Sequence, residues 1–474
     1  MNLKKLKTIH FTGIKGVGMT ALALCALDLG KKVSGSDTAE VFPTDAVLKT
    51  RKLKVKLGFS PKNLPRNCDL VIYTGAHQGS DNPEVVAAQA KNIPVLSHAQ
   101  ALGLFSSGKQ VVAVSGVGGK STVSALIAHL LTAAGFQPSY AVGAGAIFSL
   151  PAPGRFNSRS PYFVAEADEF ITDPLKNLTP RFHYLTPYMA VITNLEYDHP
   201  DVYPSLDSVF DSFIKFLQPV PKNGFIIINI DNPRCKQFIS RLNRPVITYG
   251  FSPLADWQII SHHLADKKQF FTLKVKGVTW PEMILTLPGN YNLLNATAAI
   301  VTAYNLGAST QKLQAGIKTF TGVKRRFELI SEVKKISLYD DYAHHPTEIK
   351  AVLQAAREWF PDRRLIPIFQ SHTYSRTKAL LTEFSQSFSQ ADLVVINDIF
   401  ASAREKDNLG LTSKSFSNSV AKHHRQVYYC PGKAATLAFI KHYCRSGDIL
   451  ITLGAGNNWL WHKEILWTLS KIKS

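Results

Sequence analysis

The sequence predicts an α/β protein with several domains. Its length of 474 residues suggests about three domains, and hydrophobic residues make up 45% of the chain. Short apolar runs alternate with longer helical patterns, which is typical of parallel sheets covered by helices. Charged residues account for only 19%, which excludes a largely disordered chain.

The first part of the chain reads as a strand, a glycine turn, a helix and a second strand. The elements are expected at residues 7–14, 19–29 and 33–37. The turn contains Gly13, Gly16 and Gly18. Asp37 ends the second strand 19 residues after Gly18, close to the position of a ribose-binding acid in dinucleotide-binding proteins. Lys15 replaces the middle glycine of that pattern, so the motif alone leaves a nicotinamide-dependent dehydrogenase as one possible interpretation.

A second glycine turn joins an apolar strand at 111–114 to a helix that begins near Lys120. Its residues are Gly116, Gly118, Gly119, Lys120, Ser121 and Thr122. Such a turn binds phosphate, because its N–H groups and the helix N-terminus attract anions. Lys120 would reach the outer phosphates, and the Ser121 hydroxyl would hold Mg²⁺. Val114 stands where the usual pattern has glycine, so an ordinary strand-to-helix turn is the alternative.

Two later strands end in polar clusters. The stretch 162–169 ends in Glu166-Ala-Asp-Glu, and the stretch 190–199 ends at His199. In an open parallel sheet both clusters would lie beside the phosphate-binding turn, where Mg²⁺ needs oxygen ligands. We therefore favour Glu166 and His199 as site residues over a surface acid and a turn residue before Pro200.

The stretch 245–287 is rich in β pattern, and a helix is expected at 296–306. Asn292 and Asn295 precede or open that helix. Their amides would either bind an adenine edge or cap the helix.

The last third of the chain predicts a further α/β sheet. Its strands are expected at 336–340, 365–369, 392–398 and 447–453. His344, His345 and His372 fall just past such strands, which favours a site over structural histidines. Arg325 or Arg326 would reach a transferring phosphate.

Bulk charge favours an anionic partner. The chain has 54 Lys and Arg against 34 Asp and Glu, a net charge of +20. The basic clusters are short, so a solvated basic surface is favoured over a nucleic-acid groove. No apolar run is long enough to span a membrane. Five dispersed cysteines without a CxxC pair indicate neither zinc nor redox chemistry, and they suit a reducing cytoplasm.

With these motifs assembled, the chain resembles the Mur ligase family over essentially its whole length. The shared motifs, in order, are Gly-Val-Gly-Met at 16–19, Gly-x-x-Gly-Lys-Ser at 116–121, Glu-Ala-Asp-Glu at 166–169, Thr-Asn-x-x-x-Asp-His ending at 199, Asn-x-x-Asn at 292–295, Arg-Arg-Phe-Glu at 325–328, Asp-Asp-Tyr-Ala-His-His-Pro-Thr-Glu at 340–348, and Phe-Gln-x-His-x-Tyr-Ser-Arg-Thr at 369–377. The last two are the most specific.

The resemblance implies three α/β domains. A Rossmann-like domain at 1–106 would bind the UDP end of the substrate, a P-loop mononucleotide-binding domain at 107–321 would bind ATP and Mg²⁺, and a Rossmann-like domain at 322–474 would admit the amino acid. The implied reaction is ATP-dependent ligation of L-alanine to the lactyl carboxylate of UDP-N-acetylmuramate through an acyl phosphate, in peptidoglycan precursor synthesis. It also implies a cytoplasmic monomer or weak homodimer, without nucleic-acid partners or membrane insertion.

The resemblance also implies roles for individual residues. The implied catalytic residues are Lys120, His199, Arg326, His344 and Arg376. ATP would be bound by Gly116, Gly118, Gly119, Lys120, Ser121, Thr122, Asn292, Asn295, Arg326 and Asp341. Mg²⁺ would be held by Ser121 and Glu166, with His199 supporting a second metal site. The other substrates would contact Gly16, Gly18, Met19, Asp37, His372 and Arg376.

Several positions depart from the family pattern. Val117 and Gly118 stand where Thr and His are common; Lys15 replaces a Gly, Tyr291 a His, Thr373 an Arg and Asn457 an Asp. Thr373 matters most, because an arginine there would help to bind a carboxylate. The departures leave two further alternatives: a ligase that recycles a murein tripeptide on the same sugar nucleotide, and a non-catalytic UDP-sugar-binding protein.

Overall fold

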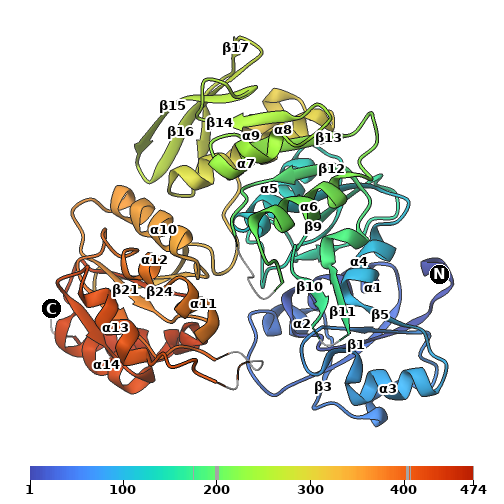
Figure 1. The fold of residues 1–474 in the computed structure, drawn as a ribbon, viewed down its shortest axis with the longest axis horizontal. Coiled ribbons are helices and arrows are strands. Elements are labelled where there is room, and N and C mark those ends of the chain that lie inside the picture. Colours follow the sequence, from blue (N-terminus) through green and yellow to red (C-terminus); the bar gives the residue numbers. More distant parts are fainter. Residues whose placement is uncertain (175, 198–201, 402–404, 406, 473–474) are drawn as a thin grey trace. The chain divides into compact units, whose positions relative to one another are not determined.

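The computed structural model describes residues 1–174, 176–197, 202–401, 405 and 407–472. Three sheets organise this part of the chain (Figure 1). The chain forms two compact units, one of residues 1–286 with 293–323 and the other of residues 287–292 with 324–474. The first two sheets share the first unit, and the third sheet forms the second. The predicted α/β class is confirmed.

The first sheet is wholly parallel and has the strand order β3-β2-β1-β4-β5. Its strands are β1 (Thr8–Thr12), β2 (Lys32–Asp37), β3 (Val55–Leu57), β4 (Leu70–Tyr73) and β5 (Val95–Ser97). Its helices are α1 (Val17–Asp28), α2 (Asp45–Thr50), α3 (Pro83–Ala90) and α4 (His98–Ser106). The strand order reverses between β1 and β4, which makes their carboxyl ends the expected place for a ligand.

The central sheet has the order β17-β16-β15-β14-β13-β12-β6-β9-β7-β8, with β18 paired to β16. Its parallel part contains β6 (Gln110–Ser115), β7 (Ser139–Ala141), β9 (Tyr162–Glu166), β12 (Pro187–Ile192), β13 (Phe225–Asn229), β14 (Ile247–Gly250) and the start of β15 (Trp257–Ala265). Antiparallel pairing adds β8 (Gly154–Arg155), β16 (Lys268–Val275), β17 (Val278–Thr279) and β18 (Met283–Leu285). The predicted β-rich stretch at 245–287 is this extension.

The helices of this region are α5 (Lys120–Ala133), α6 (Leu206–Leu217), α7 (Pro233–Ile239), α8 (Asn290–Asn305) and α9 (Thr310–Lys318). Helix α8 begins six residues earlier than the sequence predicted, directly after Gly289, so Asn292 and Asn295 lie inside the helix. A separate hairpin of β10 (Ile171–Asp173) and β11 (Asn177–Pro180) follows β9.

This hairpin packs on the first sheet's domain. Asp173 accepts the N–H of Ser80 at 3.0 Å, and a Cβ on Gly75 would lie 2.5 Å from the carbonyl oxygen of Thr172. A strand of the central sheet also contacts that domain, because a Cβ on Gly154 would lie 2.1 Å from the carbonyl oxygen of Ala21. The two domains therefore form one compact unit, and the bounds predicted between them stay a prediction.

The third sheet has the order β19-β20-β24-β21-β22-β23, with only β19 antiparallel. Its strands are β19 (Glu328–Val333), β20 (Ile336–Asp341), β21 (Leu365–Phe369), β22 (Val394–Ile396), β23 (Val427–Tyr429) and β24 (Ile449–Leu453). Its helices are α10 (Pro346–Trp359), α11 (Tyr374–Ala379), α12 (Leu381–Ser385), α13 (Ser413–Ala421), α14 (Gly432–Tyr443) and α15 (His462–Ser470).

All five cysteines are buried and unpaired, and burial raises the pKa of each thiol. They are Cys25, Cys68, Cys235, Cys430 and Cys444. Within the part of the chain that the structure describes, every helix is too short or too polar to cross a lipid bilayer.

Candidate active site

Three neighbouring strands of the central sheet end at one edge. In the parallel pairing of β6 with β9 and β12, Val114 lies opposite Glu166 and Ser115 lies opposite Ile192. The glycine turn leaves this edge and begins α5 at Lys120. The structure thus brings together the turn and the acidic cluster that the sequence predicted to share a site.

Two glycines of the turn have no room for a side chain. Gly116 has a φ of +129°, and a Cβ there would lie 2.7 Å from the carbonyl oxygen of Asn194. Gly119 has a φ of +84°, and a Cβ there would lie 2.6 Å from Oδ1 of Asn295. Asn194 also accepts the N–H of Gly118 at 2.9 Å. The residues after β12 and an amide of α8 therefore fix the turn.

Lys120 is a buried cation at this turn. Its Nζ donates to the carbonyl oxygen of Gly116 at 2.6 Å and lies 3.1 Å from the nearer carboxylate oxygen of Glu169. Burial alone would lower the pKa of Lys120, but the carboxylates of Glu169, Asp168 and Glu166 outweigh it and hold the pKa above its ordinary value. Burial also raises the pKa of Glu169, to about 7, against the opposing charge of Lys120. The ammonium is thus held charged beside the helix N-terminus.

Ser121 and Glu166 fit the predicted magnesium site. Oγ of Ser121 donates to Oε1 of Glu166 at 3.1 Å, and the N–H of Gly143 donates to Oε2 of Glu166 at 2.9 Å. A hydroxyl and a carboxylate are the oxygen ligands that Mg²⁺ takes together with phosphate and water. Among the described residues no cluster of three or more His, Cys, Asp or Glu side chains could enclose a metal. His199 lies outside the described residues.

The first glycine turn lies at the carboxyl end of β1. Gly16 is the N-cap of α1, so Gly18 and Met19 lie in its first turn. Asp37 is buried, and its two oxygens accept the N–H groups of Lys15 at 2.7 Å and Thr38 at 2.8 Å. Burial raises the pKa of Asp37 despite these bonds. Asp37 therefore fixes the turn. Its contact with substrate stays a prediction.

The lysine at the family's glycine position is accommodated by the segment after β2. The Nζ of Lys15 donates to the carbonyl oxygens of Thr38, at 3.2 Å, and of Glu40, and it lies 3.4 Å from Oδ1 of Asp45. Its ring partner is Phe42, at 5.1 Å from the centroid. The departure at residue 15 therefore adds a tie between the turn and residues 38–45.

His98, the first residue of α4, lies against the same turn. A Cβ on Gly18 would lie 2.7 Å from Nε2 of His98. Burial lowers the pKa of His98 to about 4, and the charge of Arg181 acts in the same direction. Arg181 in turn pairs with Asp168 at 2.6 Å. A neutral imidazole thus stands between the first glycine turn and the residues that follow β9.

The second compact unit carries its own cluster at the carboxyl end of β20. Asp341 is buried, and its oxygens accept the N–H groups of Phe327 and Ala343, both at 2.7 Å. Burial raises the pKa of Asp341 to about 6, although the charge of Arg326 opposes this shift. Arg326 stacks on the ring of Tyr342 at 5.2 Å.

His344 and His345 follow this strand and begin α10. Nδ1 of His344 lies 3.0 Å from the carbonyl oxygen of Tyr342 and 3.5 Å from Oε2 of Glu348. His345 caps the helix by accepting the N–H of Thr347. Of the two histidines, His344 shares the ring of Tyr342 with Arg326, and its role at the nucleotide stays a prediction. His345 is accounted for as a helix cap.

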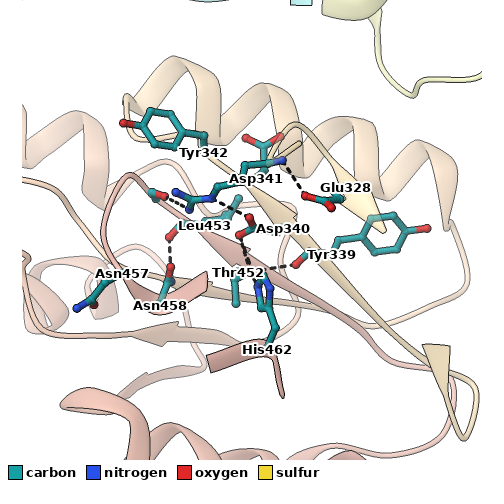
Figure 2. Close-up of polar contacts among 12 residues, drawn as sticks. Glu328, Tyr339, Asp340, Asp341, Tyr342, Thr452, Leu453, Asn457, Asn458 and His462 are labelled. Atoms are coloured by element: carbon teal, nitrogen blue, oxygen red, sulfur yellow. Dashed lines mark hydrogen bonds and ion pairs between the residues drawn. The ribbon is translucent and has the colours of Figure 1, made fainter. Parts of the chain in front are cut away.

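Arg325 and Arg326 have different surroundings. Nε of Arg325 donates to Asp340 at 2.8 Å, and its Nη2 donates to the carbonyl oxygen of Gly454 at 2.8 Å. Figure 2 shows Asp340 beside Thr452 and His462, and the Thr452 hydroxyl donates to Asp340 at 2.7 Å. Arg325 is thus buried in a structural network, which leaves Arg326 as the arginine expected to meet phosphate.

His372 and Arg376 lie on the segment that follows β21. His372 stacks on Phe400 with ring centroids 5.8 Å apart. Thr373 has a φ of +71° and caps α11, where its Oγ1 accepts the N–H of Arg376 at 3.4 Å. Glu405 accepts the N–H of Tyr374 at 2.6 Å at the same helix end. The structure therefore groups His372 and Arg376, and a carboxylate lies near them.

Comparisons with known proteins cover all three regions. Residues 8–110 match the family model "Mur ligase family, catalytic domain", residues 114–303 "Mur ligase middle domain" and residues 325–456 "Mur ligase, glutamate ligase domain". The chain is 37% identical over 454 residues to a UDP-N-acetylmuramate–L-alanine ligase of Desulfitobacterium hafniense, covering 95% of this chain and 97% of the relative. The chain belongs to the Mur ligase family.

Two solved structures align with this Mur ligase over nearly its whole length. A UDP-N-acetylmuramate–alanine ligase of Thermotoga maritima aligns with a TM-score of 0.78 at 25% identity, over 98% of both chains. A murein peptide ligase of Psychrobacter arcticus aligns with a TM-score of 0.70 at 24% identity, over 99% of this chain and 100% of that one. Both confirm the three-domain fold of this Mur ligase. These matches give no support to a nicotinamide-dependent dehydrogenase.

Several residues that contact the predicted site residues were not singled out from the sequence. Glu169 was read only as part of an acidic cluster, and its pairing with Lys120 needs the direction of both side chains. His98 lies outside every shared motif. Glu348 was noted only as the last residue of the 340–348 motif, although it lies three residues after His345 in a capping pattern. His77, in the loop after β4, was also missed.

Proposed function

We propose that this chain is an ATP-dependent ligase that joins L-alanine to the lactyl carboxylate of UDP-N-acetylmuramate in peptidoglycan precursor synthesis. The observation that carries the proposal is the 37% identity, over nearly the whole of both chains, to a relative named for that reaction. Further relatives with the same name match over 96% of this chain. The Lys120 turn and the Ser121–Glu166 pair supply the groups that such chemistry needs.

The reaction has two steps. The lactyl carboxylate attacks the γ-phosphorus of ATP, giving an acyl phosphate and ADP. The amine of alanine then attacks the activated carbonyl carbon, and inorganic phosphate leaves as the amide forms. Both reactants of the first step are anions, so their repulsion must be neutralised in the site.

Lys120 is assigned to this neutralisation. Its charged Nζ stands at the start of α5, where a triphosphate would meet the helix N-terminus. To contact the outer phosphate, the ammonium would exchange the Glu169 carboxylate for phosphate oxygen. Ser121 and Glu166 would hold Mg²⁺, which supplies further charge neutralisation when bound. Asn295, against Gly119, is assigned to the adenine side of ATP.

The second unit is assigned to the nucleotide and to the incoming amino acid. Arg326 and Asp341, with His344, are assigned to the nucleotide by their family positions. His372 and Arg376 are assigned to the lactyl carboxylate and the amino acid. Five unpaired thiols suit a reducing cytoplasm as the place of the reaction.

The proposal is tested by the requirement for all three substrates. The purified chain is incubated with ATP and Mg²⁺, with and without UDP-N-acetylmuramate and L-alanine, and phosphate release and product mass are measured. We expect phosphate only when all are present, with a product heavier by one alanine residue. A rate of phosphate release that is the same with and without UDP-N-acetylmuramate would refute the proposal. Binding of the sugar nucleotide without any turnover would also refute it.

A second candidate is a ligase for a murein tripeptide. It is favoured by Thr373, because a threonine replaces the arginine expected to help hold a single amino acid's carboxylate. The same assay with the tripeptide L-alanyl-γ-D-glutamyl-meso-diaminopimelate in place of L-alanine distinguishes the two. A higher kcat/KM for the tripeptide than for alanine would replace the first proposal by this one.

A further inference from the structure

The loop after β4 lies where a ligand is expected in the first sheet. The strand order reverses between β1 and β4, and ligands of open parallel sheets bind outside the carboxyl ends at such a point. Gly13 directly follows β1 and has a φ of +81°. A Cβ there would lie 2.5 Å from Cγ2 of Thr74 and 3.6 Å from Cδ2 of His77. The His77 ring is therefore packed beside the glycine turn at the reversal point.

The imidazole of His77 has partners on two sides. Its Nε2 lies 3.6 Å from Oδ1 of Asp37, the buried carboxylate at the end of β2. Its ring lies 5.0 Å from the ring of Phe59. The side chain is still 27% exposed. The ring is thus oriented by a carboxylate and an aromatic residue while part of it stays accessible to a ligand.

The backbone of this loop is held in an unfavourable conformation. His77 has a φ of +53° and Gln78 a φ of +70°, a region that side chains other than glycine seldom adopt. The loop is fixed by Asn82, whose Nδ2 donates to the carbonyl oxygen of His77 at 3.0 Å, and by Asp173, which accepts the N–H of Ser80. Such strain persists where surrounding contacts impose it, and it is common at ligand sites.

We propose that the His77 imidazole donates a hydrogen bond to the diphosphate of the sugar nucleotide, in an orientation set by Asp37. The chemistry favours the diphosphate over the base or ribose, because the ring lies beside Gly13 at the start of the turn that leads to the N-terminus of α1, and a hydrogen-bond donor complements an anion there. This inference rests on the proposed function for the presence of a sugar nucleotide. It adds a binding residue that lies outside every shared motif of the chain.

The test compares His77→Gly with Gln78→Gly. Both changes relieve a positive φ in the same loop, and only the first removes the imidazole. Dissociation constants for UDP-N-acetylmuramate, UDP and uridine are measured by calorimetry on the full chain. His77→Gly should weaken UDP-N-acetylmuramate and UDP by about 10-fold or more, as expected for loss of a charge-assisted hydrogen bond, and leave uridine within about twofold. Gln78→Gly should match the wild type for all three.

Two further variants test the charge. His77→Lys should bind UDP more tightly than His77→Gln, because only lysine places a cation beside the diphosphate. Thermal unfolding of each variant shows whether it is folded. Equal UDP affinity of His77→Gly and Gln78→Gly would overturn the proposal, as would an equal loss for uridine and UDP. If the wild-type chain binds neither UDP nor UDP-N-acetylmuramate, the proposed function fails together with this inference.

Discussion

Lys120 holds two partners at once, the carbonyl oxygen of Gly116 and the carboxylate of Glu169. This arrangement keeps a cation in place beside the helix N-terminus before any nucleotide arrives. At the scale of single residues, the site therefore depends on charges that are already compensated inside the protein.

Removing this cation should abolish most of the activity. Lys120→Ala should lower kcat for ATP-dependent phosphate release by about 100-fold or more, because the repulsion between two anionic reactants is no longer neutralised. Lys109→Ala is the matched control, since Nζ of Lys109 also donates to a carbonyl oxygen, that of Asn157 at 2.9 Å, but at the start of β6. A near-normal rate for Lys120→Ala would show that Lys120 and its turn do not take part in the reaction.

A buried glutamate of the first domain should control acid stability. Burial alone would raise the pKa of Glu84, but hydrogen bonds from His10, Ser36 and Asn63 outweigh it and lower the pKa from 4.5 to about 2. A folded-state pKa below the unfolded value gives stability that is present above pH 4.5 and is lost as the pH falls toward 2.

Glu84→Gln should therefore lower the free energy of unfolding at pH 7 by about 3 kcal/mol, at about 1.4 kcal/mol per pKa unit. Urea unfolding at pH 7 and pH 3 measures this loss, which should be smaller at pH 3. Glu40→Gln, at an exposed position of the same domain, should change little at either pH. An equal loss at both pH values would contradict the linkage.

The sequence predicted Lys120, Ser121 and Glu166 as neighbours because the carboxyl ends of parallel strands meet. It did not predict the Lys120–Glu169 pair or the position of His77. The Lys120–Glu169 pair depends on the direction of side chains at a strand end. The position of His77 depends on a loop conformation with positive φ, which residue type alone does not predict. The sequence therefore predicted residues of the candidate site but not the neighbouring side chains that orient them.

At the scale of elements, the β10–β11 hairpin joins the acidic cluster after β9 to the loop after β4. Gly79 of that loop has a φ of +51°, and a Cβ there would lie 2.6 Å from Oδ1 of Asp173. Gly58, in the same domain, has a φ of +77° and no neighbour within 4 Å of such a Cβ. An alanine at either position would have the same unfavourable positive φ, but only an alanine at residue 79 would also collide with Asp173.

Gly79→Ala should thus destabilise the chain by about 1–3 kcal/mol more than Gly58→Ala, which is the usual range for overpacking. Urea unfolding of the two variants and the wild type measures the difference. Equal losses of unfolding free energy in the two variants would mean that the hairpin moves aside easily and does not fix the loop.

Elements with a clear apolar run were predicted best. Strand β21 begins and ends at the residues expected from the sequence. Helix α8 began earlier than predicted, because asparagines near a helix start were read as caps, while here Asn292 donates to the carbonyl oxygen of Pro288 from within the helix. The hairpin β10–β11 was not predicted, since its short polar strands carry no apolar alternation.

At the scale of the whole molecule, two compact units each have their own buried core. Calorimetry should show two unfolding transitions, because each unit is built around a core of its own. UDP at about 100 times its dissociation constant should stabilise only the unit that contains the first sheet, by about 2.7 kcal/mol. A single transition that moves as a whole would contradict this expectation.

Three domains were predicted from length and motif order, and the described residues form three large sheets besides the two-stranded β10–β11 hairpin. The close packing of the first two into one unit was not predicted, because it depends on contacts such as Gly154 against Ala21 that lie far apart in the chain. Sequence patterns describe each domain, whereas the joining of domains is decided by surfaces that no single motif marks.

The distribution of the buried cysteines makes the chain its own reporter of local opening. Cys25 and Cys68 belong to the first sheet's domain, Cys235 to the central domain, and Cys430 and Cys444 to the last. A thiol reagent applied in short pulses, followed by peptide mass spectrometry, would record when each region exposes its interior. The order in which these thiols become labelled during unfolding would then give the order in which the domains unfold, without any introduced probe.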